Sequence, residues 1–254
     1  MTALRVQRSK MRIVLSRKGF DSAAGGGASP IVDGVPLSLP IPAGAASSTT
    51  YRDLGLGAHA HLASKGRVSE DDACHHDPMF LPGGTCLFGQ VGAAQTHLAN
   101  QGVGVGDVFL FFGLFREEQT GEPHHRFFGW LEIERMIHLA DCDEQRRQEL
   151  IAHGHPHAIK MHGSNDCIYA GPGGVARHAS YALRLTVPGG PPSLWQRPEW
   201  LKRGGLSYHD RKDRWRPADR LQSVARGQEF VADIGRRKVP REWLARSLAE
   251  LKAS

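Results

Sequence analysis

Two histidine-rich stretches contain the side chains best suited to chemistry. The first is CHHDP, in which a thiol, two imidazoles and a carboxyl group lie within four residues, 74–77. The second is HGHPHAIKMH, residues 153–162, where His155 and His157 would point to the same side of a strand. Such groups can hold a metal ion, or pair a nucleophile with a base.

We expect these two stretches to meet in one site. Its candidate catalytic groups include His75, Asp77 and His157, and its candidate metal ligands are Cys74, His75, Asp77, His155 and His157. A divalent metal is a candidate cofactor of unknown identity, because the spacing matches no standard zinc signature. Two alternatives stay open: Cys74 acts as a nucleophile beside a histidine, or the histidines only form hydrogen bonds with loop backbone.

A third candidate region is LSRKGFDSAAGGG, residues 15–27, where a short apolar run leads into polar groups and three glycines. Glycines after a strand let backbone N–H groups approach a phosphate closely. The candidate phosphate-binding residues are Ser16, Lys18, Ser22, Gly25, Gly26 and Gly27. Asp21 is a further candidate catalytic base, or a partner for Arg17 or Lys18. The pattern is neither a Walker loop nor a Rossmann fingerprint, and a flexible linker is the alternative.

Polar groups further along the chain suit the recognition of a base. Amides can bind base edges and an aromatic ring can stack on a base. The candidates are Gln90, Gln95, Asn165, Asp166 and Tyr169. The late stretch YHDRKDRW mixes aromatic and basic residues, as in single-strand binding, although an exposed basic loop anchored by its aromatic residues is the alternative.

The overall composition is that of a folded protein. The 254 residues are 40% hydrophobic and 23% charged, and no run reaches the roughly 20 apolar residues that span a bilayer. The four cysteines are scattered and the first residues contain no apolar signal block, so we expect a cytoplasmic protein without disulfides. The net charge of +6 permits a nucleic acid or a nucleotide as partner, and the lack of a long apolar run gives no reason to expect a membrane.

Hydrophobic patterning predicts a mixture of strands and helices. We expect a flexible extension over 1–10 and a single α+β domain over 11–254, with a mixed or antiparallel sheet. Strands are predicted at 11–15 and 180–187, a tight turn at 33–34, and an antiparallel hairpin from 108–115 and 127–137. Helices are predicted within 89–102, 143–153 and 239–252, with a weaker helical signal in 51–73.

Several of these segments together resemble a known family, the bacterial and phage nucleotide-modification-associated domain 3 family. The resemblance covers roughly residues 11–235 and rests on segments in the expected order. They are LSRKGFDSAAGGGASPI, YRDLGLG, CHHDPMF, FGQVGAAQTHLANQGVGVGDVFLFFGLFR, FFGWLEI, HPHAIKMHGSNDCIYAG and RGQEFVAD. It implies a role in DNA-base modification, with other components of such a system as partners, and no particular reaction.

A shorter resemblance concerns the central hairpin. GDVFLFFG and FFGWLEI are similar to the core hairpin of PUA-like domains, which implies a small β-barrel with peripheral helices. We therefore expect a protein that binds a nucleotide or flipped base and catalyses group transfer or hydrolysis. The alternatives are a non-catalytic reader of modified bases with a PUA-like barrel, and a structural subunit. The density of polar groups favours an enzyme.

Overall fold

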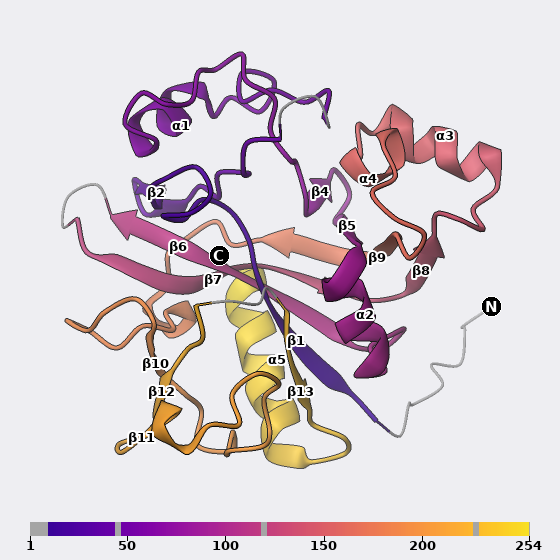
Figure 1. The fold of residues 1–254 in the computed structure, drawn as a ribbon. Coiled ribbons are helices and arrows are strands. Elements are labelled where there is room, and N and C mark those ends of the chain that lie inside the picture. The colour runs from indigo at the N-terminus through magenta and orange to yellow at the C-terminus, as the bar shows by residue number, and fades with distance from the viewer. Residues whose placement is uncertain (1–9, 44–46, 118–120, 226–228, 254) are drawn as a thin grey trace.

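The fold is built around one large mixed β-sheet in the order β13-β1-β6-β7-β9-β5-β4 (Figure 1). The computed structural model describes residues 10–43, 47–117, 121–225 and 229–253. The strands of this sheet, including β2, β3 and β8 at its margins, are β1 (Arg12–Arg17), β2 (Ser29–Val32), β3 (Val35–Pro36), β4 (Met79–Leu81), β5 (Thr85–Gln90), β6 (Val108–Glu117), β7 (Pro123–Glu132), β8 (Arg135–His138), β9 (Cys167–Val175) and β13 (Glu229–Asp233).

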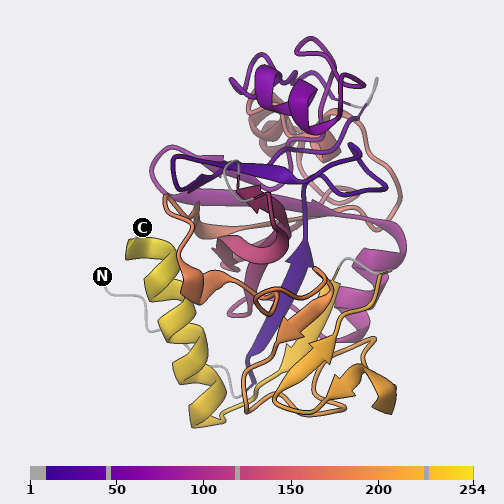
Figure 2. The same ribbon diagram turned by 90° about the vertical axis from the view of Figure 1, so that its left-hand side faces the viewer.

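A second, smaller sheet and several helices surround the large sheet (Figure 2). The small sheet consists of β10 (Leu194–Gln196), β12 (Arg220–Gln222) and β11 (Trp215–Arg216). The helices are α1 (Gly57–Ala63), α2 (Gly92–Asn100), α3 (Glu144–Ala152), α4 (Pro156–Ile159) and α5 (Lys238–Ala253), with 3₁₀ turns at Tyr181–Leu183 and Lys212–Arg214. None of the described helices has both the length and the apolar character needed to cross a bilayer.

Strand β6 is buried on both faces because its side chains alternate between two hydrophobic clusters. Leu110 and Phe112 pack on the face covered by α5, in the same cluster as Leu244. Phe109 and Phe111 point to the opposite face. β6 runs parallel to β1 and antiparallel to β7, so the predicted buried hairpin is confirmed.

Strand β9 connects the two halves of the sheet. Its first part, from Cys167 to Pro172, pairs with β5, and residues Gly173–Val175 pair with β7. The sheet stays open, since β4 and β13 remain at opposite ends in the part of the chain that the structure describes. The predicted α+β class with a mixed sheet and peripheral helices is confirmed, whereas the expected PUA-like closed barrel is not formed.

Local signals predicted most elements where they occur. Asp143 begins α3 by accepting a hydrogen bond from the N–H of Arg146, and Pro240 lies in the first turn of α5. Asp33 and Gly34 form the β2–β3 turn with φ of 48° and 78°. The predicted extension over 1–10 lies outside the described residues except for Lys10.

Two local predictions were wrong, whereas the helix predicted within 89–102 is confirmed as α2. Residues 180–187 contain a 3₁₀ turn and two isolated bridges instead of a strand, because Ser180 caps the turn through the N–H of Ala182. Gly89 and Gln90 end β5, so the helix predicted within 89–102 begins at Gly92. His155 and His157 do not lie on a strand: they cap and form the short helix α4, where Pro156 favours a first helical turn.

Candidate functional site

A cavity of about 550 Å³ opens between the end of β1, the start of α2 and the segment before β4. Its lining includes many of the predicted site residues and the first turn of α2. The polar side chains in the lining are Arg17, Lys18, Asp21, His75, Asp77, Gln90, His157 and His162. Asp21, His75 and His157, which lie far apart in the sequence, therefore face one space.

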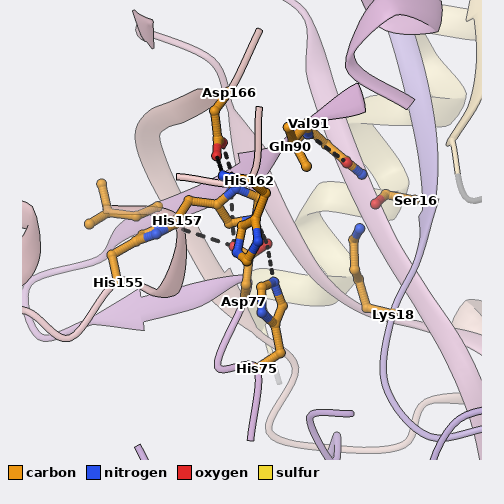
Figure 3. Close-up of polar contacts among 12 residues, drawn as sticks. Ser16, Lys18, His75, Asp77, Gln90, Val91, His155, His157, His162 and Asp166 are labelled. Carbon is orange, nitrogen blue, oxygen red and sulfur yellow. Dashed lines mark hydrogen bonds and ion pairs between the residues drawn. The ribbon is translucent and has the colours of Figure 1, made fainter. Parts of the chain in front are cut away.

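Asp77 lies at the centre of a histidine cluster on one wall of this cavity (Figure 3). Its side chain is 3% exposed, and its Oδ1 accepts a hydrogen bond of 2.9 Å from the N–H of Gly89. Its Oδ2 lies 3.7 Å from Nε2 of His75 and 3.8 Å from Nε2 of His157. Burial alone would raise the pKa of Asp77, but the surrounding imidazoles outweigh it and lower the pKa, so the group is a carboxylate.

His157 is held from its other side by a second buried carboxylate. Its Nδ1 lies 2.6 Å from Oδ1 of Asp166, whose Oδ2 accepts the N–H of His162 at 3.0 Å. Burial opposes the charged form of His157, but the bond to Asp166 and the charge of Asp77 raise its pKa overall. The ring lies against β5 at Gly89, where a Cβ atom would be 2.3 Å from the imidazole, so this position requires glycine.

Three of these groups are placed as metal ligands would be. One ligand atom each from His75, Asp77 and His157 all lie within 4.8 Å of one another. Two imidazoles and one carboxylate are a donor set of catalytic zinc and non-haem iron sites. The site can therefore hold a metal ion, and the same groups can exchange protons with a bound ligand.

A second polar network lies across the cavity from the histidines (Figure 3). The buried Glu229 of β13 accepts hydrogen bonds at Oε1 from Ser16 and Lys18, each of 3.1 Å, and from Gln90. The ammonium of Lys18 also lies 4.3 Å from the ring centre of Phe88. Lys18 is thus paired inside the protein, and a ligand in the cavity meets an ion pair there.

The sequence match to known families covers this whole arrangement. A family model for nucleotide modification associated domain 3 matches residues 12–233. The chain belongs to this family. The matched residues run from β1 to β13, so they include the large sheet and both polar networks of the cavity. The chain has no match among curated proteins or solved structures.

Two predicted metal ligands are not placed as ligands in this family member. Cys74 is fully buried in a cluster with Phe20, and burial raises the pKa of its thiol to about 12. Such a thiol is a poor nucleophile and a poor ligand. His155 is fully buried behind the cavity wall, with Nε2 3.8 Å from Oδ1 of Asp77, and burial lowers its pKa to about 4.

The predicted glycine cradle does not face the cavity. Ser22, Gly25 and Gly26 line a separate hollow of about 370 Å³ beside Arg67, and Gly27 packs against the backbone of Ala63. Oδ1 of Asp21 accepts the N–H groups of Ala23 and Ala24 and turns the loop away. From this loop, Gly19, Asp21 and Ala24 join Arg17 and Lys18 in the cavity lining.

Of the predicted base-recognition groups, Gln90 alone lines the cavity. Gln95 and Tyr169 form a buried hydrogen bond of 2.9 Å in the aromatic core. Asn165 fixes the start of α2 by accepting the N–H of Gly92 and donating to its carbonyl. Gln95, Tyr169 and Asn165 therefore contact the elements around the cavity and do not line it. Asp166 contacts the site through His157.

The basic stretch near the C-terminus also lies outside the cavity lining. Trp215 packs on the core and donates from Nε1 to the carbonyl of His209, while Arg214 binds backbone carbonyls. Tyr208 is half exposed and lies 4.4 Å from the ring of His97. The alternative of a basic loop anchored by its aromatic residues fits Trp215.

Sequence reasoning missed Glu229 as a site residue. Its one signal was an acidic residue at the start of the apolar run EFVA. The run alone does not reveal its partners, because they come from β1 and β5.

Proposed function

We propose that this protein binds a nucleotide, or a base extruded from DNA, in the cavity and catalyses a hydrolysis or group transfer on it within a nucleotide-modification system. The observation that supports this most is one cavity with two opposed polar walls. One wall holds the His75, Asp77 and His157 cluster, and the other holds Arg17 and the Lys18–Glu229 pair.

The size and the boundary of the cavity support a ligand of this class. A volume of about 550 Å³ falls in the range of roughly 300–1,000 Å³ for small-molecule sites. Val91 and Ala94, at the first turn of α2, border it together with the cationic Arg17. A helix N-terminus and a guanidinium both favour an anion such as a phosphate.

The histidine cluster supports catalysis over reading. A reader needs donors and acceptors that match a base, whereas a buried carboxylate surrounded by imidazoles is costly to build. Groups of this kind can move protons at a bound substrate. Hydrolysis needs only water: its oxygen forms the new bond, and its proton passes to the leaving group through an imidazole. Group transfer requires a second substrate as donor.

Steric block of the cavity tests the binding step. Ala94 lines the cavity on α2, and its neighbour Ala93 is exposed and does not line it. We expect Ala94→Phe to weaken binding of nucleoside monophosphates and short single-stranded oligonucleotides at least tenfold, and Ala93→Phe to leave it unchanged. Equal affinities of the two variants in calorimetric titrations would contradict the proposal.

Mass spectrometry tests the chemical step. Nucleotides and DNA incubated with the protein should change in mass, and Asp77→Asn should abolish the change. Binding at the cavity without a change in mass, with and without added divalent metal and candidate donors, would favour the reader.

A further inference from the structure

We propose that His75, Asp77 and His157 bind one divalent transition-metal ion whose open coordination positions face the cavity. This inference names the cofactor of the proposed catalytic site and in that sense rests on the proposed function. Metal binding itself can nevertheless be measured without any nucleotide.

The first argument is the distance between the ligand atoms. Metal–ligand bonds of about 2.0–2.2 Å place neighbouring ligand atoms roughly 3–3.5 Å apart. Oδ2 of Asp77 lies 3.7 Å from Nε2 of His75 and 3.8 Å from Nε2 of His157, and the three atoms fit within 4.8 Å. Closing the site around an ion would therefore take a few tenths of an ångström at Asp77 and up to roughly 1–2 Å between the two imidazoles.

The second argument is that two of the three ligands are already oriented. The 2.6 Å bond to Asp166 fixes Nδ1 of His157 as the donor and leaves the lone pair of Nε2 toward Asp77. Such carboxylate–histidine pairs accompany metal sites because they set the tautomer and raise the basicity of the ligand. Gly89 likewise binds Oδ1 of Asp77 and leaves Oδ2 for the ion.

The third argument is charge. Asp77 and Asp166 place two buried carboxylates on either side of the His157 ring. Lys18, a cation of the cavity lining, is held by Glu229 instead. Burying two carboxylates close together is unfavourable, and a divalent cation bound beside them would compensate their charge.

The donor set also indicates the class of metal. Two nitrogens and one oxygen suit Zn²⁺, Mn²⁺ or Fe²⁺, whereas Mg²⁺ and Ca²⁺ prefer oxygen ligands throughout. Three protein ligands leave room for water or substrate, and the ring of His162 lies on the same side, 5.3 Å from that of His157. A bound ion would supply Lewis-acid activation of water or of a substrate oxygen.

Competition titration tests the inference. The full chain, stripped with EDTA, is titrated with Zn²⁺ and with Mn²⁺ against a chromogenic chelator. We expect one ion per chain and no competition from Mg²⁺. His75→Ala and His157→Ala should each weaken affinity by more than the roughly 10–100-fold typical of losing an outer partner. The control His153→Ala removes an exposed histidine of the same run and should bind like the wild type.

Further measurements distinguish the loss of a metal ligand from misfolding, and the metal site from the proposed function. His75 is 23% exposed, so His75→Ala should keep the circular dichroism spectrum and the EDTA-state melting temperature of the wild type. Absent metal uptake, or equal affinity in wild type and both ligand variants, would overturn the inference. If the protein bound nucleotides in EDTA but took up no metal, the metal site would be refuted and the proposed function would stand. If it took up metal but bound no nucleotide, the proposed function would be refuted and the metal site would stand.

Discussion

Nδ1 of His157 lies 2.6 Å from Oδ1 of Asp166, inside the wall of the cavity. Asp166 does not line the cavity itself, so its influence on the proposed ligand or ion would pass through the imidazole. This relationship makes Asp166 a positioning residue and His157 the group that it positions.

Asp166→Asn should therefore weaken the proposed metal site without removing a ligand. We expect a loss of about 10–100-fold in Zn²⁺ affinity, because Asn lacks the charge that makes His157 basic. The pH dependence of binding should also shift, which a merely structural role would not cause. Asp141→Asn, an exposed site, is the control, and wild-type affinity in Asp166→Asn would contradict the assignment.

Gly89→Ala should displace His157 from its place against β5. The added Cβ would lie 2.3 Å from the ring, and overpacking of this kind costs about 1–3 kcal/mol. We expect lower stability in urea denaturation together with weaker nucleotide or metal binding. Gly174→Ala in β9 is the matched control, since its Cβ would meet only ordinary contacts at 3.5 Å. Equal effects of the two substitutions would show that the close approach at Gly89 is unimportant.

Lys18→Met should leave the buried Glu229 without its charged partner. Removing one member of a buried pair costs about 3–5 kcal/mol, because the other charge stays desolvated. The double variant Lys18→Met/Glu229→Gln should recover part of that loss. Chemical denaturation of wild type, both single variants and the double variant measures the coupling, and strict additivity would contradict it.

His125 should make the protein sensitive to acid. The pKa of His125 is lowered to about 3, chiefly by burial and secondarily by the charge of Arg17. Its Nδ1 accepts a hydrogen bond from Nε1 of Trp195. The unfolded state then binds the extra proton below about pH 6.5, so stability falls as the pH drops from 6.5 toward 3. Titration of His125 should therefore lower the free energy of unfolding by about 2 kcal/mol between pH 7.5 and pH 5.

The variant His125→Gln, which keeps an acceptor for Trp195, should reduce that pH dependence. Urea denaturation at pH 7.5 and 5 gives the two free energies of unfolding. The difference between them should be smaller in the variant, and an unchanged difference would mean that His125 does not titrate in this way.

Alkylation should distinguish Cys142 from the other cysteines. Cys74, Cys86 and Cys167 are fully buried and burial raises the pKa of each thiol, whereas Cys142 is partly exposed. Iodoacetamide at pH 8 should label Cys142 alone in the native protein and all four thiols after denaturation, as mass spectrometry would show. Rapid labelling of Cys74 would revive its role as a nucleophile.

The sequence by itself determined the elements whose signals are local. The apolar run of β6, the Asp143 cap of α3 and the Asp33-Gly34 turn each depend on a few neighbouring residues. The α+β class followed from these elements. The family followed from long sequence motifs, which can be identified without knowing any tertiary contact.

Only the tertiary structure decided which side chains share a site. His75 and Asp77 precede β4, His157 lies on α4, and β9, β7 and β1 bring the Glu229 network opposite to them. Long-range strand pairing sets those distances, and no local pattern encodes it. For the same reason Cys74 and the glycines, chemically plausible in the sequence, face a hydrophobic cluster and a separate hollow.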